Sequence, residues 1–157
     1  MAIPPFFIFS GRRMVPELMD GCSPGAVGRM SESGWSNAEL FRDFIENHFL
    51  KYVPLQHNKT VLLHMDGHKT HATVGLAEWA RDRNIILYIL PAHTSHGASP
   101  LDVGCYGPLQ KMYNFECHKF MRDSQSSITR YDICKIICKV YSKAMSTENL
   151  ISSFKKT

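Results

Sequence analysis

Two short apolar runs stand out in the middle of the chain, and each stops abruptly at a turn-forming residue. The first covers residues 61–65 and stops at Asp66, and the second covers residues 85–90 and stops at Pro91. Both have the length and the branched side chains of strands buried on both faces, and a helical pattern over residues 70–83 separates them. This arrangement predicts a βαβ unit with two parallel strands.

The apolar pattern elsewhere predicts two more strands and three more helices. Residues 3–9 and 26–30 read as short strands, which we expect to pair as an antiparallel ribbon. Apolar side chains at three- and four-residue spacing predict the helices, which cover residues 38–52, 105–122 and 130–145. We expect Ser36 or Asn37 to cap the first of these helices and Thr129 the last. Strands that alternate with helices indicate an α/β fold.

Composition is that of an ordinary globular protein, with 44% hydrophobic and 20% charged residues in a chain of 157. The net charge of +4 fits contact with nucleic acid but does not require it. The five cysteines form no CxxC pair, which indicates reduced thiols in an intracellular protein. No apolar run approaches the roughly 18–20 residues that span a bilayer, so we expect no membrane partner.

Two aspartates are the strongest candidates for chemistry. Asp66 ends the first central strand, and Asp102 follows the second strand behind a polar loop. Because parallel strands end at one edge of a sheet, the two carboxylates are expected to converge there. Carboxylate oxygens suit Mg²⁺ or Mn²⁺. Each aspartate also has a simpler interpretation, Asp66 as part of an Asp-Gly turn and Asp102 as a helix N-cap.

Other polar residues near these aspartates allow two further interpretations. Exposed cations would contact nucleic-acid phosphates, with histidines as additional donors. These candidates are Lys69, His71, His93 and Lys111, with Arg12, Arg13 and Lys119 as further cations. The histidines also allow a structural zinc site, although no cysteine pair supports one. That alternative depends on His64, His68, His71, His93 and His96.

The two central motifs resemble a known family. LLHMDGHKTH (residues 62–71) followed by ILPAHTSHGASPLDVGCYGPLQKMY (residues 89–113) resembles the DDE endonuclease domain of pogo-, Tigger- and jerky-type transposases. PPFFIFSGRR and SESGWSNAELFRDFIENHFL look like the second and third strands and the following helix of that domain. The resemblance implies an RNase H-like mixed sheet flanked by helices, and metal-dependent cleavage and transfer of DNA strands. It assigns Asp66 and Asp102 as catalytic, metal-binding carboxylates.

The sequence departs from the family pattern at two places. Gly97, Ala98 and Ser99 stand where the family usually has Leu-Leu-Gln. The family's first aspartate, on its first central strand, has no counterpart, because Asp20 and Asp43 are the only aspartates before Asp66 and neither ends an apolar strand. We therefore expect an N-terminally truncated domain that lacks the first central strand, with unpaired sheet edges and no cleavage activity alone.

The resulting hypothesis divides the chain into a partial DDE endonuclease domain at residues 1–145 and a C-terminal tail at residues 146–157. Its expected partners are DNA and other copies of this or related transposase-derived chains. The expected location is the nucleus. The alternative hypothesis is a domesticated, non-catalytic module that binds protein.

Overall fold

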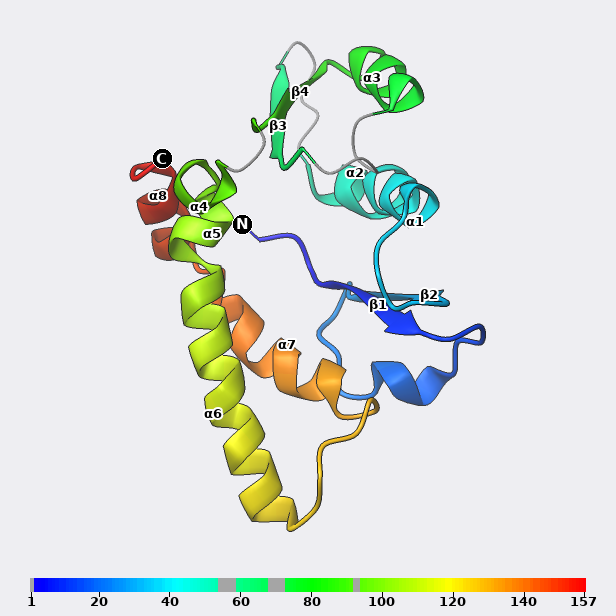
Figure 1. Cartoon of the computed structure of the whole chain (residues 1–157), viewed down its shortest axis with the longest axis vertical. Helices are drawn as coiled ribbons and strands as arrows, with labels where there is room; N and C mark the ends of the chain where they lie inside the picture. Colours follow the sequence, from blue (N-terminus) through cyan, green and yellow to red (C-terminus); the bar gives the residue numbers. More distant parts are fainter. Residues whose placement is uncertain (1, 54–58, 68–72, 92–93) are drawn as a thin grey trace. The chain divides into compact units, whose positions relative to one another are not determined.

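The structure, a computed structural model, describes residues 2–53, 59–67, 73–91 and 94–157. It consists of two compact units, which we name for their place in the sequence. The central unit comprises residues 36–99, and the terminal unit comprises residues 1–35 and 100–157. Each unit combines a small parallel sheet with helices (Figure 1). The fold is therefore α/β, as predicted.

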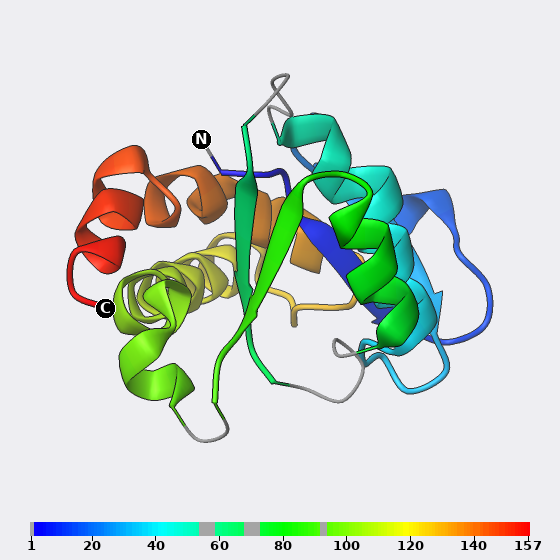
Figure 2. The ribbon, with the colours of Figure 1, turned by 90° about the horizontal axis from the view of Figure 1, so that it is seen from above.

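The central unit contains the predicted βαβ unit. Strands β3 (Val61–Met65) and β4 (Ile85–Ile89) pair in parallel, with Val61 opposite Ile85. Helix α3 (Val74–Arg81) connects them and lies along β4, as Figure 2 shows. The Thr73 hydroxyl accepts a hydrogen bond from the Leu76 N–H at 3.3 Å and caps α3. The prediction of parallel strands joined by a helix is confirmed.

The prediction that both central strands are buried on both faces is wrong. Leu62 and Ile86 are paired in register, yet they are 63% and 56% exposed, and Tyr88 on the same face is 51% exposed. Helix α3 covers the other face with its buried residues Leu76, Trp79 and Ala80, while Val74 and Ala77 of the same helix are exposed. Because a single helix covers this pair of strands, one face of the pair is buried and the other contacts water, as in many antiparallel sheets.

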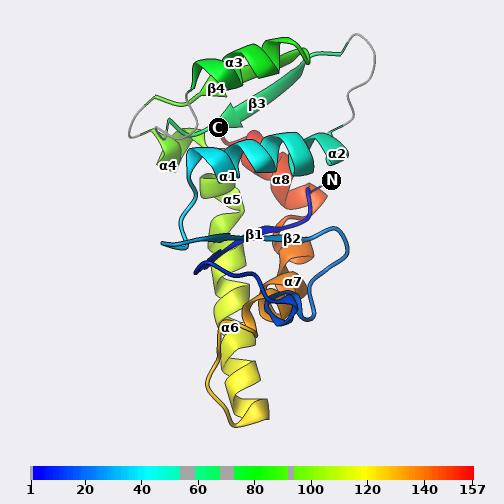
Figure 3. The same cartoon turned by 90° about the vertical axis from the view of Figure 1, so that its right-hand side faces the viewer.

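The predicted helix at residues 38–52 forms, but its middle is a π-helix. The segments α1 (Ala38–Asp43), η2 (Phe44–Phe49) and α2 (Leu50–Tyr52) follow one another as a continuous rod in Figure 3. The side chain of Asn37 accepts the N–H of Leu40 at 2.9 Å, so Asn37 is the N-cap, as predicted. A short helix, α4 (Ser95–Ala98), completes the described part of this unit.

The strands of the terminal unit are parallel, which corrects the antiparallel prediction. β1 (Phe6–Ser10) pairs with β2 (Val27–Ser31) from Phe6 opposite Val27 to Ser10 opposite Ser31. A parallel return needs a crossover of about a dozen residues or more, and residues 11–26 provide it. This connection carries a 3₁₀-helix, η1 (Pro16–Met19), whose Leu18 is fully buried. The two sheets are separate, so the described strands do not form one mixed sheet.

Four helices complete the terminal unit. Helix α6 packs against α7, and α5 packs against α8 (Figure 1). Their bounds are α5 Pro100–Gly104, α6 Tyr106–Ser124, α7 Ile133–Ala144 and α8 Thr147–Phe154. Helix α6 agrees with the prediction within two residues, and α7 begins later than predicted because residues 130–132 form a turn. The C-terminal segment folds as α8, which Ser146 caps.

The N-cap residue of α7 is Asp132 and not Thr129, which corrects the prediction, and the Asp132 side chain holds the turn before the helix. Its carboxylate accepts hydrogen bonds from the Thr129 N–H at 3.0 Å and the Thr129 hydroxyl at 2.8 Å. These bonds, with Lys135 as a weaker contributor, hold the pKa of Asp132 below its ordinary value. A carboxylate with a lowered pKa stabilises the fold above its ordinary pKa, and that contribution disappears as the pH falls through the folded-state value.

We expect Asp132→Ala to lower the free energy of unfolding at pH 7 by about 0.5–1.5 kcal/mol, because it removes the hydrogen bonds that the carboxylate accepts from Thr129. Urea unfolding at pH 7 and at acid pH measures this, and the difference between variant and wild type should shrink at pH values below 3.8, the ordinary pKa of the group. Asp123→Ala is the control, since Asp123 makes an exposed ion pair with Arg122 at 3.4 Å, and such pairs contribute little. An undiminished difference at acid pH would contradict the assignment.

Candidate functional site

Asp66 lies where the sequence predicts it, directly after the last residue of β3. The strand pairing extends to Leu90, one residue beyond β4, because the Leu90 N–H donates to the Met65 carbonyl at 2.9 Å. At Gly67 a Cβ atom would meet the Leu90 carbonyl oxygen at 3.1 Å, so glycine allows a close approach of the two strand ends. Asp66 is exposed at this carboxyl edge of a parallel pair.

Asp102 lies in α5, inside the helix instead of at its N-cap position. The helix begins at Pro100, a residue type that favours the first turn, and the Asp102 side chain is exposed. Asp66 belongs to the central unit and Asp102 to the terminal unit. The predicted convergence of the two carboxylates therefore stays a prediction.

The predicted nucleic-acid contacts fall partly within the described chain. Lys69, His71 and His93 lie outside the described residues. Lys111 is exposed on α6. Of the further cations, Arg12 donates from Nε to a Glu32 carboxylate oxygen at 3.0 Å, and both side chains are largely exposed.

Metal ligation is not evident in the described part of the chain. Within residues 2–53, 59–67, 73–91 and 94–157, no three His, Cys, Asp or Glu side chains gather in a group suited to a metal ion. Of the histidines behind the zinc alternative, His64 packs the edge of its ring against Tyr88, with ring centroids 5.2 Å apart. His68, His71 and His93 lie outside the described residues.

The cysteines are free thiols, as the sequence indicates. Three of them, Cys22, Cys134 and Cys138, lie in the terminal unit near the core that contains Phe9 and Leu18. Burial raises the pKa of Cys134 to about 12, and the neighbouring Cys138 and Cys22 add to this effect. A thiol with so high a pKa is protonated at neutral pH, so Cys134 acts as a small apolar core residue.

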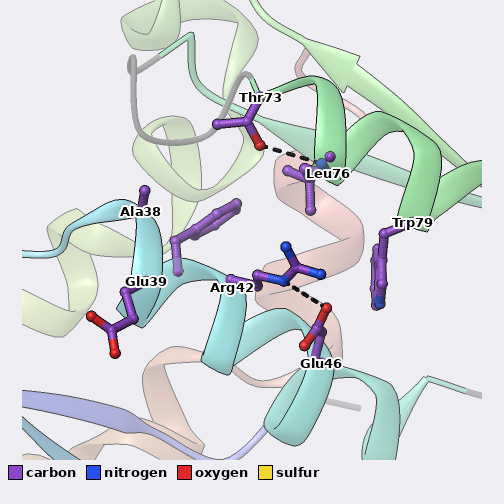
Figure 4. Close-up of a pocket in the computed structure, with 9 residues that line it drawn as sticks. Ala38, Glu39, Arg42, Glu46, Thr73, Leu76 and Trp79 are labelled. Atoms are coloured by element: carbon purple, nitrogen blue, oxygen red, sulfur yellow. Dashed lines mark hydrogen bonds and ion pairs between the residues drawn. The ribbon is translucent and has the colours of Figure 1, made fainter.

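A cavity of about 370 Å³ in the central unit was not foreseen from the sequence. It lies between α1, η2 and α3, and its walls include Phe41, Leu76 and Trp79 (Figure 4). Arg42 points into this space and donates from Nε to Glu46 at 2.9 Å. The spacing of Arg42 and Glu46 signals a helical ion pair, but the sequence does not show which helix faces it. Asp66 is not among the lining residues.

Comparisons with known proteins place the chain in a family. The sequence matches the family described as DDE superfamily endonuclease over residues 4–156. It is 29% identical over 160 residues to the MFS-type transporter clz9 of Cochliobolus lunatus. That match covers 98% of this chain, which spans 17% of the length of the relative. No solved structure matches. In the described part of the chain, no helix has the length and apolar character needed to cross a membrane.

Proposed function

The chain belongs to the DDE superfamily endonuclease family, and we propose that it is an RNase H-like, transposase-derived domain that binds DNA. In this proposal Asp66 and Asp102 supply the carboxylates for metal-dependent DNA strand cleavage. The observation that supports it most strongly is the position of Asp66 after β3, at the carboxyl edge of a parallel strand pair. Ligands and catalytic groups of α/β proteins collect outside that edge.

The donor chemistry of the two aspartates suits Mg²⁺ or Mn²⁺. Both side chains are exposed, and these ions prefer carboxylate oxygens while they keep several water ligands. Such an ion would activate water and stabilise the leaving oxygen of a phosphodiester. The aspartates would hold the ion through their ionised oxygens, and nearby cations would hold the DNA backbone.

The positions of the aspartates in this chain indicate that metal binding would be weak. Asp20 follows η1, and Asp43 accepts a hydrogen bond from the Asn47 side chain at 2.8 Å within a helix, so neither ends a strand. Two carboxylates leave most of the metal's ligand positions to water. We therefore propose that this 157-residue chain binds DNA and has little or no cleavage activity by itself.

A plasmid-nicking assay in Mg²⁺ and in Mn²⁺, combined with duplex-DNA binding without metal, tests this proposal. The expected result is binding of duplex DNA, with at most slow nicking that requires the metal. Any such nicking should fall to background in Asp66→Ala and in Asp102→Ala, while DNA binding stays within about twofold. Nicking that survives both substitutions would contradict the proposed site, and absence of DNA binding would contradict the proposed role.

The exposed face of the central strands supports a second candidate, a non-catalytic module that binds protein. Leu62, Ile86 and Tyr88 expose 63%, 56% and 51% of their surface, and apolar patches of this kind often mark interaction sites. The partner would be another copy of this chain or a related chain. The same assays separate the candidates, because this module would neither nick nor bind DNA.

The proposed role in DNA binding also predicts where in the cell the protein acts. A DNA-binding domain of this family would act in the nucleus, which we propose as its location.

A further inference from the structure

The net positive charge of the chain belongs to one of its two units. The terminal unit contains 12 lysines and arginines and 8 aspartates and glutamates, which accounts for all of the net charge of +4. The central unit contains 6 of each kind and is neutral. A polyanion attracted by the overall charge would therefore be attracted mainly to the terminal unit.

Within this unit, two cations, a histidine and a phenylalanine form an exposed stripe along one face of α6, which we call its outer face. Lys111, Phe115, His118 and Arg122 follow one another at four-, three- and four-residue steps along the helix, which places them on one face. All four side chains are exposed. The eleven residue steps from Lys111 to Arg122 span about 16 Å of α-helix, so the stripe matches several nucleotides of an extended strand. Lys119 flanks it and is also exposed.

The opposite face of α6 packs on α7. Phe120 lies under the Lys135 ammonium group, 4.8 Å from the ring centroid. Glu116, the acidic residue in the middle of α6, lies 3.9 Å from the Lys139 ammonium group, and its side chain is only 21% exposed. The carboxylates of this helix are thus Glu116 on the α7 side and Asp123 at the end, where Asp123 contacts Arg122 at 3.4 Å. The middle of the stripe contains no acidic side chain.

Phe115 is the unusual member of the stripe. It is 67% exposed between cationic side chains, although phenylalanine is among the residue types most often buried. An aromatic ring that stands in water on a cationic surface suits stacking with an unpaired base, since every base has a π-face and the backbone beside it carries phosphates. In an intact duplex the bases stack on one another, so the ring would have no base to contact.

We propose that the outer face of α6 binds single-stranded DNA, with Phe115 stacked on an unpaired base and with Lys111, Lys119 and Arg122 at the phosphates. The proposal rests on the proposed function, because it takes DNA as the polyanion, and it adds a strand preference and a surface. His118 lies between the cations and supplies a further hydrogen-bond donor to the backbone. An acidic peptide or an anionic membrane would use the same cations but would not need the base-stacking role of Phe115.

Fluorescence anisotropy with a labelled oligo-dT strand and a labelled duplex, both without metal, tests the proposal. Stacking on one base contributes about 1–3 kcal/mol by alanine substitution, so Phe115→Ala should raise the Kd for oligo-dT roughly 5- to 150-fold. The Kd for the duplex should change less than twofold. Phe115→Tyr should keep most of the affinity, because it keeps the ring. Circular dichroism checks that each variant is folded.

Control variants test whether the losses of DNA binding are specific to the Phe115 ring and to the cations of α6. Trp35→Ala removes another exposed aromatic side chain of the same unit, which is 78% exposed and does not belong to α6, and should leave the Kd for oligo-dT unchanged. Lys111→Gln combined with Arg122→Gln should weaken binding of both DNA forms and lower the salt slope for oligo-dT by about 1.4, at roughly 0.7 per phosphate contact of a single strand. The pair Lys51→Gln and Arg81→Gln removes as many charges from the central unit and should change the slope much less.

The outcomes distinguish this inference from the proposed function. Equal losses from Phe115→Ala and Trp35→Ala, or equal losses for oligo-dT and duplex, would overturn the α6 surface while DNA binding itself stands. Stronger binding of polyglutamate or of anionic vesicles than of oligo-dT would also overturn it. Oligo-dT binding is measured without metal and nicking with metal, so failure of the nicking proposal does not affect this test.

Discussion

Leu18→Ala is expected to lower the free energy of unfolding of the terminal unit by about 2–5 kcal/mol, the range for a buried leucine that leaves a cavity. Leu18 has no exposed surface and packs in one cluster with Phe9 and Cys134. It lies on η1, which packs against α7, so its side chain joins the crossover connection to the helices of the unit. Urea or thermal unfolding followed by circular dichroism measures the loss.

Leu101→Ala is the matched control for this prediction. It makes the same chemical change in the same unit, but Leu101 is 38% exposed, so water and neighbouring side chains can fill the space. We expect a loss of about 0.5 kcal/mol or less there. A Leu18→Ala variant as stable as Leu101→Ala would show that η1 is not part of the core.

Leu18 also explains why the sequence predicted the wrong pairing for the first two strands. The apolar pattern located β1 and β2 within a few residues, but a strand pattern alone does not reveal the direction of its partner. The direction depends on the path of residues 11–26, whose two prolines and glycines read as an irregular loop. In the structure these residues form a crossover whose Leu18 is buried in the core, and the strands that it connects are parallel.

The central strands show a different limit of the sequence pattern. Their position, their parallel pairing and the helix between them were all predicted correctly, since length, turn residues and helical periodicity define a βαβ unit. Their burial was not, because a continuous apolar run is typical of a doubly covered strand whether or not covering elements are present. Leu62 and Ile86 follow the pattern of a buried strand and yet are largely exposed.

The sequence predicted individual residues of the candidate site better than it predicted their arrangement. The motif around Asp66 fixed its place at a strand end, because an apolar run followed by Asp-Gly defines where the strand stops. Lys111 was selected for its charge alone. The stripe that it forms with Phe115 and Arg122 becomes visible only with the helix face that α7 leaves open, so Phe115 was missed.

Gly104→Ala is expected to destabilise the terminal unit by about 1–3 kcal/mol, the usual cost of overpacking a core. Gly104 ends α5, and a Cβ atom built there would overlap the Ser153 hydroxyl oxygen and lie 2.9 Å from the Ser153 Cβ. Rotation of Ser153 would not relieve the second overlap. Ser153 is buried, and its hydroxyl already donates to the Asn149 carbonyl at 2.6 Å, so α5 and α8 would have to separate.

Two further variants make this prediction specific. Gly107→Ala is the control, because a Cβ atom there meets nothing within 4 Å and alanine favours helix; it should be neutral or slightly stabilising. Ser153→Gly removes the overlapping atoms, at a cost of about 1 kcal/mol for glycine in a helix. The double variant Gly104→Ala with Ser153→Gly should therefore lose less free energy of unfolding than the two single variants lose together. Additive losses would show that α5 and α8 do not meet at these residues. Asp102 lies on α5, so a displacement of this helix by Gly104→Ala would also move a proposed metal ligand. Adding Ser153→Gly to Gly104→Ala should then restore any metal-dependent nicking together with stability.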